Sequence, residues 1–321
     1  TTGTITATIT EGDLATLTTL TDANGNNALT ITVTDTTAAA ADLNTVDAIT
    51  SVAVDATTVT TLTGTATAIV TAAQSAGITT AADYAATVNS GTATVAQALI
   101  LDADTTGAIT ATISNGDLAT LTTLTDANAN NVLTITVTDT SADAANLVTV
   151  DGITSVTVVA TAVTTITGSA AEIIAILTGG TTTIATDVNF IIDEDASAAN
   201  ILTIAAATTG EITATLISGE LTLALSGSTA SKNTITLNDD GVTVTGSNQV
   251  DEITVGSGTD ILNLGAGADI VNVNAADGHR DIINTEAGAD NIFINDGAVG
   301  ATDVITIDGG DDADVLTVSG T

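Results

Sequence analysis

The stretch GSGTDILNLGAGADIVNV, residues 256–273, places a Gly-x-Gly-x-Asp group twice, nine residues apart. Each group precedes a short alternation of apolar and polar residues, and alternating residues point to opposite faces of a β-strand. Each nine-residue unit therefore predicts a glycine-rich turn and a short strand whose aliphatic side chain enters a core. Two such units would complete one coil of a flattened parallel roll, with Asp251 and Asp269 along one edge and Asp260 along the other.

Further aspartates continue this pattern along the chain, at less regular intervals. The matched positions are Asp251, Asp260, Asp269, Asp281, Asp290, Asp303 and Asp314. The first three follow each other at the nine-residue period, and the later ones keep to it less strictly. Residues 238–321 contain 16 of the 38 acidic residues, about twice the density found elsewhere in the chain. Carboxylates stacked one strand spacing apart repel each other unless a cation neutralises them.

A hard cation such as calcium prefers six or more oxygen ligands. Stacked loops can supply them as carboxylates and as backbone carbonyls that glycines leave accessible, so we predict that Ca2+ binds in this region. The predicted metal-site residues are Asn248, Asp251, Gly256, Gly258, Asp260, Gly265, Gly267, Asp269, Asp281, Asp290, Asp303, Asp311 and Asp314. The alternative is a plain β-solenoid in which the Asp and Asn residues form turns without metal.

The net charge of the chain is strongly negative. Against 38 Asp and Glu residues there are 2 Lys and Arg residues, which gives a formal net charge of −36 at pH 7. This charge disfavours nucleic acids and anionic membranes as partners and favours cations. No apolar run approaches the roughly 20 residues that span a bilayer, so no direct membrane insertion is expected. Strong acidity is also typical of proteins from saline habitats.

The side chains available for a core are small and uniform. Apolar residues make up 44 % of the chain, but the aromatic ones are only Tyr84, Phe190 and Phe293, and Trp, Met and Cys are absent. The abundance of Thr, Val and Ile argues for a folded chain rather than a disordered acidic one. Small, uniform side chains favour a thin, repetitive interior built from similar layers.

A long internal repeat organises the remainder of the chain. Residues 3–64 return as residues 107–168, with about three quarters of the positions identical at an offset of 104. A third, abbreviated copy begins at residues 210–227. We therefore predict repeat 1 at 1–106, repeat 2 at 107–209, a shortened third repeat at 210–237 and a calcium-binding β-roll at 238–321.

Within each copy the pattern is that of short strands. TITATIT, ALTITVT and ITSVAV alternate Thr with aliphatic residues, which predicts half-buried strands with Thr outward, and TDANGNN and TDANANN predict Asx-rich turns. The Ala-rich stretches at 37–48, 65–77 and 169–177 are compatible with short helices. Because proline is absent, successive strands can stack without interruption. The predicted fold class is all-β, with solenoid-like repeats followed by a parallel β-roll.

The remaining polar features favour ordinary interpretations. The acidic run at 193–195 is interpreted as a solvated loop, and His279, the only histidine, as a surface residue. Without Cys and without a Gly-x-Ser-x-Gly motif, nucleophilic catalytic sites cannot be built in the usual ways. We expect no enzymatic activity.

The units VGSGTDILN, LGAGADIVN and GGDDADVLT resemble the calcium-binding nonapeptide of the repeats-in-toxin (RTX) family, Gly-Gly-x-Gly-x-Asp-x-aliphatic-x. The resemblance covers residues 246–318 and departs at Val255, Leu264 and Asp312, which stand where the family has Gly. It implies an extracellular protein, exported by a one-step type I route, that folds on meeting calcium. That family carries its export signal at the extreme C-terminus, and nothing that resembles such a signal follows residue 318. We therefore expect this chain to be a piece of something longer.

Three functions remain open. The Thr- and Ala-rich array is similar to bacterial surface-layer proteins and large secreted adhesins, so the first is a structural surface layer or filament whose copies join through calcium. The second is an adhesin stalk that holds a binding tip away from the cell. The third is the secretion and folding region of an exoenzyme. The near-identical repeats favour the first two, because repetition builds length or a lattice.

Overall fold

The computed structural model describes residues 3–274, 280–295 and 304–319. Asp303 and His279 therefore lie outside the described residues. The chain divides into two compact units, one of residues 1–138 and 149–159 and the other of residues 139–148 and 160–321. None of the helices in the described parts of the chain is long and apolar enough to cross a membrane.

The first unit is built from short parallel strands and short helices. Its strands are β1 (Thr6–Thr8), β2 (Ala28–Thr30), β3 (Thr37–Ala39), β4 (Val54–Ala56), β5 (Thr61–Gly64), β6 (Ile78–Thr80), β7 (Ala85–Val88), β8 (Ile109–Thr112) and β9 (Val132–Thr134). Its helices are α1 (Leu14–Leu17), α2 (Ala40–Asp47), α3 (Ala66–Ala73), α4 (Val95–Asp104) and α5 (Leu118–Leu121). The main sheet has the order β3-β5-β7-β8-β9.

The register of this sheet shows that the chain winds in coils. Thr37 pairs with Thr61, and Thr61 pairs with Ala85, so each coil brings the chain back to the same column of the sheet. The inward side chains Leu62 and Ala86 are completely buried. The alternation of inward aliphatic and outward polar residues thus becomes a stack of thin core layers, because every strand turns the same face inward.

The helices begin at local signals in the sequence. The hydroxyl of Thr65 accepts a hydrogen bond from the backbone N–H of Ala68 at the start of α3. At the start of α4, Thr94 and Gln97 form a reciprocal capping box. Side-chain caps of this kind satisfy backbone N–H groups that a helix leaves without a partner, and they favour helix initiation at these residues.

The second unit contains a longer stack of parallel strands. Its strands are β10 (Ser141–Asp143), β12 (Thr165–Gly168), β13 (Thr182–Ile184), β14 (Asn189–Ala196), β15 (Glu211–Leu216), β16 (Thr222–Ala224), β17 (Lys232–Thr236), β18 (Thr243–Thr245), β19 (Val250–Thr254), β20 (Ile261–Asn263), β21 (Ile270–Val273), β22 (Arg280–Asn284), β23 (Asn291–Asn295), β24 (Val304–Asp308) and β25 (Val315–Ser319). Its helices are α7 (Ala170–Gly179) and α8 (Ala198–Ala205), while α6 (Ala144–Asp151) and β11 (Val158–Ala160) contain residues of both units.

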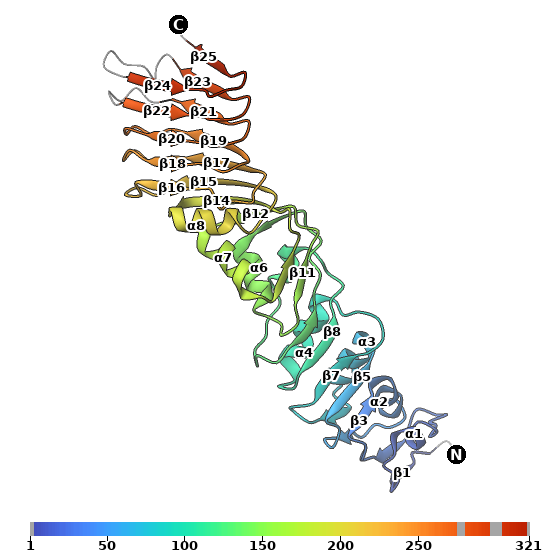
Figure 1. Cartoon of the computed structure of the whole chain (residues 1–321). Helices are drawn as coiled ribbons and strands as arrows, with labels where there is room; N and C mark the ends of the chain where they lie inside the picture. Colours follow the sequence, from blue (N-terminus) through green and yellow to red (C-terminus); the bar gives the residue numbers. More distant parts are fainter. Residues whose placement is uncertain (1–2, 275–279, 296–303, 320–321) are drawn as a thin grey trace. The chain divides into compact units, whose positions relative to one another are not determined.

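Two parallel sheets form the roll of the second unit. One has the order β10-β12-β14-β15-β17-β19-β21-β23-β25 and the other the order β16-β18-β20-β22-β24, and from β15 to β24 each coil contributes one strand to each sheet (Figure 1). Asn233 pairs with Asp251 in the shortest coils, each of which holds two nine-residue units. Asn291 pairs with Val315 in a longer coil near the end of the roll.

The prediction of a chain dominated by parallel β-sheet is confirmed, and helices were expected at three of the observed positions, α2, α3 and α7. The expectation of an all-β fold holds only in part, because the described residues contain eight helices. All of them end at or before Ala205, and the described residues after α8 form only strands and turns. The Ala-rich segments with capping residues become helical because Ala has the highest helix propensity and the caps replace missing backbone partners.

The acidic run at 193–195 is not the loop that the sequence suggested. It belongs to β14, and all three of its residues are exposed. The register between β14 and β15 shifts between Ile191 and Asp195, which marks a bulge or similar irregularity there. The solvated part of the interpretation is therefore confirmed, and the loop part is wrong because the run continues a paired strand.

Candidate metal centre

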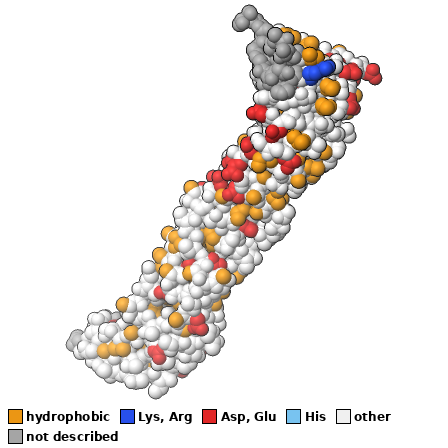
Figure 2. Space-filling view, turned by 90° about the vertical axis from the view of Figure 1, so that its left-hand side faces the viewer, with side chains coloured by type: hydrophobic (Ala, Val, Ile, Leu, Met, Phe, Trp, Pro, Cys, Tyr) orange, Lys and Arg blue, Asp and Glu red, His pale blue; other side chains and the backbone are white. Residues whose placement is uncertain are grey.

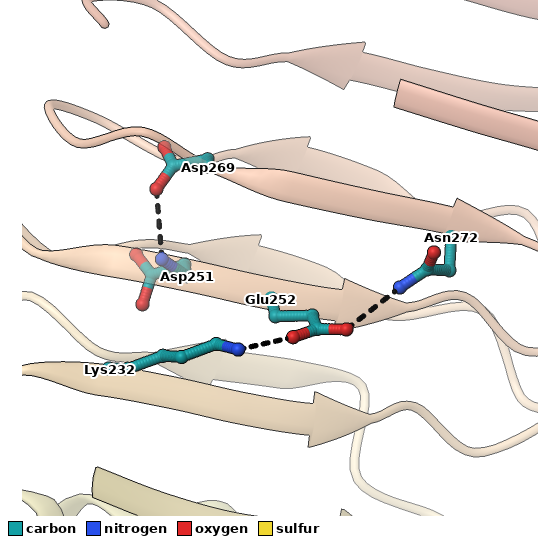
Figure 3. Close-up of polar contacts among 5 residues, drawn as sticks. All are labelled: Lys232, Asp251, Glu252, Asp269 and Asn272. Atoms are coloured by element: carbon teal, nitrogen blue, oxygen red, sulfur yellow. Dashed lines mark hydrogen bonds and ion pairs between the residues drawn. The ribbon is translucent and has the colours of Figure 1, made fainter. Parts of the chain in front are cut away.

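One column of aspartates runs along an edge of the roll. The backbone N–H of Asp251 donates to Oδ1 of Asp269 at 2.9 Å, that of Asp269 to Asp290 at 2.8 Å, and that of Asp290 to Asp314 at 3.1 Å. Figure 3 shows the first of these contacts. Each carboxylate thus reaches back to the main chain of the preceding coil. We call Asp251, Asp269, Asp290 and Asp314 the first column.

A second column lies in the half-coil between these positions. The backbone N–H of Asp260 donates to Oδ1 of Asp281 at 2.9 Å, and the backbone N–H of Val242 donates to Oδ1 of Asp260 at 2.7 Å. Asp260 is completely buried and Asp281 nearly so. The aspartates therefore alternate between two columns along the chain, which is the geometry expected of two nine-residue half-coils per turn.

The irregular spacings do not break the first column. The sequence separation grows from the pair Asp251 and Asp269 to the pair Asp269 and Asp290, and again to the pair Asp290 and Asp314. All three pairs nevertheless keep the same contact between a backbone N–H and a carboxylate. Strand pairing of β21 with β23 and of β23 with β25 keeps the aspartates in register despite the longer coils.

Glycines allow neighbouring loops to approach at backbone distance. A Cβ atom on Gly288 would lie 1.4 Å from the carbonyl oxygen of Gly267, and one on Gly256 would lie 1.8 Å from that of Asn238. A Cβ on Gly267 would lie 2.4 Å from the carbonyl oxygen of Gln249. Any other residue would push these loops apart, so the glycines preserve close stacking of carbonyl groups beside the columns.

Burial changes the acid–base behaviour of the first column. Loss of solvent raises the pKa of Asp269 to about 7, and the neighbouring carboxylates of Asp251 and Asp290 add to this rise, while the N–H of Asp251 opposes it. Burial also raises the pKa of Asp251. Asp269 Oδ2 and Asp290 Oδ2 are buried and have no hydrogen-bond partner. Such oxygens suit a cation, because a buried charge without a partner is costly.

Asp251 differs from the two aspartates that follow it in the column. Its Oδ2 accepts the backbone N–H of Ser247 at 2.7 Å, and its Oδ1 accepts the side-chain amide of Asn233 at 2.7 Å. Asn233, which the sequence analysis did not single out, occupies the column position one coil before Asp251. Continuing the repeat backwards by two nine-residue units from Asp251 would have found it, and the same step from Asp260 leads to Val242.

The other predicted residues surround the columns in different ways. Gly256 donates its N–H to Asp260 Oδ2 at 3.2 Å, Gly258 is buried, and Gly265 has a positive φ of 93°. Asn248 and Asp311 are exposed. Among the described residues, no three His, Cys, Asp or Glu side chains converge to hold a metal ion. A cation in either column would therefore draw part of its oxygen ligands from backbone carbonyls.

Basic side chains do little to neutralise this acidity. Lys232 pairs with Glu252 at 2.5 Å on the outward face of the sheet, and the amide of Asn272 donates to the same carboxylate at 3.3 Å (Figure 3). On the face shown in Figure 2, acidic side chains are scattered widely and basic ones occupy one small area. Within the described parts of the chain, Lys232 is thus engaged by Glu252 and not by the first column.

Comparison with known proteins adds no family to this description. No family model, no curated protein and no solved structure matches the chain. The assignment of the site therefore rests on its residues and their geometry.

Proposed function

We propose that the chain is a structural protein of the cell surface or extracellular space, whose roll is ordered by calcium and whose copies assemble into a surface layer or filament. The observation that carries the calcium part is the pair of buried, unpartnered oxygens, Asp269 Oδ2 and Asp290 Oδ2, within a column of carboxylates. Asp269 and Asp290 in the first column, and Asp260 and Asp281 in the second, would hold calcium together with loop carbonyls. The bound ion supplies positive charge where carboxylates are crowded and buried.

The structural role is supported by repetition and by charge. Residues 3–64 and 107–168 repeat one sequence, and parallel coils follow each other within each unit. Repeated coils build length, and a net charge of −36 keeps chains apart until cations screen or bridge them. The resemblance to RTX repeats supports export by a type I route, with folding on arrival in a calcium-rich exterior.

A stalk of a secreted adhesin is the second candidate, supported by the same stacked coils, since a rigid stack of this kind can serve as a spacer. Calcium would stiffen a stalk without joining copies of the chain. The RTX region of an exoenzyme is the third candidate and would share the calcium response.

A calcium titration of the purified chain tests the proposal. Far-ultraviolet circular dichroism and particle size are followed together, with magnesium as the control ion. We expect a calcium-specific gain in β signal with growth into sheets or filaments. The same gain at constant size would favour the stalk, and no response to calcium would contradict the metal assignment.

A further inference from the structure

We propose that Asn233, with Ser228 and Ser247, terminates the first column by hydrogen bonding, so that cation binding along this column begins at Asp269 and not at Asp251. This inference rests on the proposed calcium function. Asn233 is completely buried on β17 and lies in register with Asp251 on β19. It is thus the residue that occupies the column where an aspartate would stand one coil earlier.

Both polar atoms of the Asn233 side chain have partners. Its Nδ2 donates to Asp251 Oδ1 at 2.7 Å and to Ser247 Oγ at 3.3 Å. Its Oδ1 accepts the hydroxyl of Ser228 at 2.9 Å. An amide can donate toward the column and accept from the other side at once, which neither an ionised carboxylate nor an aliphatic side chain can do.

The carboxylate of Asp251 is satisfied as a result. In addition to Asn233, the backbone N–H of Ser247 donates to its Oδ2 at 2.7 Å, and the Ser247 hydroxyl lies 3.2 Å from both oxygens. Asp269 and Asp290 each keep a buried oxygen without a partner. The need for a cation therefore starts at Asp269, because both oxygens of Asp251 have donors that offset part of the cost of burying its charge.

An aspartate at position 233 would change this boundary. It would remove the donor to Asp251 Oδ1 and set a second carboxylate against it at close range, which repels in a buried setting. Residues 233 and 251 would then form a pair of carboxylates like Asp269 and Asp290. The N233D variant should therefore need, and bind, one additional cation.

The test counts bound calcium and measures stability without calcium in the full chain. Calcium is counted by equilibrium dialysis and isothermal titration, and stability is the urea midpoint in the presence of a chelator. The variants are N233D, N233A, D251N and D269N. Asn128→Asp, which adds the same charge in the first unit, is the matched control.

We expect N233D to lower the calcium-free midpoint more than Asn128→Asp does, and to bind one more calcium ion per chain than the wild type. N233A should lower the midpoint without any gain in calcium. D251N should keep the wild-type calcium count, whereas D269N should lose at least one ion.

Two results would overturn the inference while leaving the calcium function in place. In the first, the wild type binds calcium but N233D binds no more calcium ions per chain than the wild type does. In the second, D251N loses as many calcium ions as D269N. A wild type that binds no calcium would overturn the proposed function and this inference together. If N233D does not fold even with calcium, the counts for D251N and D269N decide.

Discussion

The backbone N–H of Asp269 donates a 2.8 Å hydrogen bond to Oδ1 of Asp290, which lies one coil further along the roll. Asp290 thereby fixes the start of the preceding coil with one oxygen, while its second oxygen is buried without a partner. The Oδ1 atoms of the column hold neighbouring coils together, whereas the buried Oδ2 atoms of Asp269 and Asp290 have no partner and destabilise it. In the proposed function, calcium would compensate the cost of burying these two oxygens.

Neutralising one aspartate of the column should separate the stabilising hydrogen bond at Oδ1 from the destabilising buried charge. In D269N, the Oδ1 acceptor for Asp251 remains and the buried charge is removed. We expect the calcium-free free energy of unfolding to rise by about 1–3 kcal/mol, because a buried charge without a partner costs more than a buried amide. The additional stabilisation by calcium should fall. Urea denaturation with and without calcium measures both quantities.

The control for this change is D195N, which removes an exposed carboxylate of the same unit that lies outside the two columns. It should alter the free energy of unfolding by less than about 0.5 kcal/mol in either condition. If D269N lowered the calcium-free stability, the unpartnered oxygen would have to be stabilising in some other way.

The pKa of Asp269 gives a pH dependence with a defined sign. Its pKa of about 7 in the folded chain lies above the value of about 3.9 expected in the unfolded chain. Its protonation therefore contributes stability that is complete below about pH 4 and is lost as the pH rises through about 7. We expect the urea midpoint of the calcium-free second unit to fall between pH 5 and pH 8.

Other carboxylates act in the opposite direction. Hydrogen bonds from Thr16 and Thr120 hold the pKa values of Asp13 and Asp117 below their usual range, and the stability that these groups contribute is lost as the pH falls. The difference between wild type and D269N isolates Asp269. A difference that does not shrink as the pH is lowered from 8 to 5 would contradict its raised pKa.

The sequence predicted that the aspartates alternate between two edges of the roll, because a nine-residue period restricts where each aspartate can lie in a coil. When one coil holds two nine-residue units, aspartates two units apart must lie directly above each other, as Asp251 and Asp269 do. What the pattern did not indicate was that the same coil begins earlier, at Asn233 and Val242. Neither residue is an aspartate, so a search for aspartates stops at Asp251, although stepping back by two nine-residue units would have reached both positions.

Helices were harder to foresee than strands. The Ala-rich segments predicted α2, α3 and α7, but α1, α4, α5, α6 and α8 were not predicted. The segment Thr94–Gln97 carries a capping-box pattern that could have indicated α4. The longer coils of the first unit also stayed hidden, since the long repeat dominates self-comparison and the coils differ from one another in sequence. Tertiary stacking, rather than local propensity, sets their length.

The glycine contacts predict that an alanine substitution is more destabilising at Gly288 than at Gly25. In Gly288→Ala, the new Cβ would lie 1.4 Å from the carbonyl oxygen of Gly267, and Gly288 has a positive φ of 148°. We expect a loss of about 1–3 kcal/mol or more, because the loops must separate to admit a methyl group. Gly25→Ala is the matched control, since no atom lies within 4 Å of its new Cβ.

Gly25 also has a positive φ, of 65°, so its substitution is not free of cost. The corresponding loop of the second copy tolerates Ala129 at a φ of 55°. We therefore expect Gly25→Ala to cost about 1 kcal/mol and to leave the calcium count unchanged. Equal effects of the two substitutions on calcium binding would argue against close loop stacking beside the columns.

The capping box of α4 offers a test of the helical part of the fold. Thr94→Ala removes the hydroxyl that accepts the N–H of Gln97, and it leaves the Gln97 side chain bonded to the backbone N–H of residue 94 and to the hydroxyl of Thr67. The free energy of unfolding of the first unit should fall by about 0.5–2 kcal/mol, as is usual for loss of an N-cap. Thr71→Ala, on the exposed surface of α3, should be neutral or slightly stabilising because Ala has the higher helix propensity. Thermal and urea unfolding followed by circular dichroism compare the two variants, and an equal loss in both would show that the capping contact does not set the start of α4.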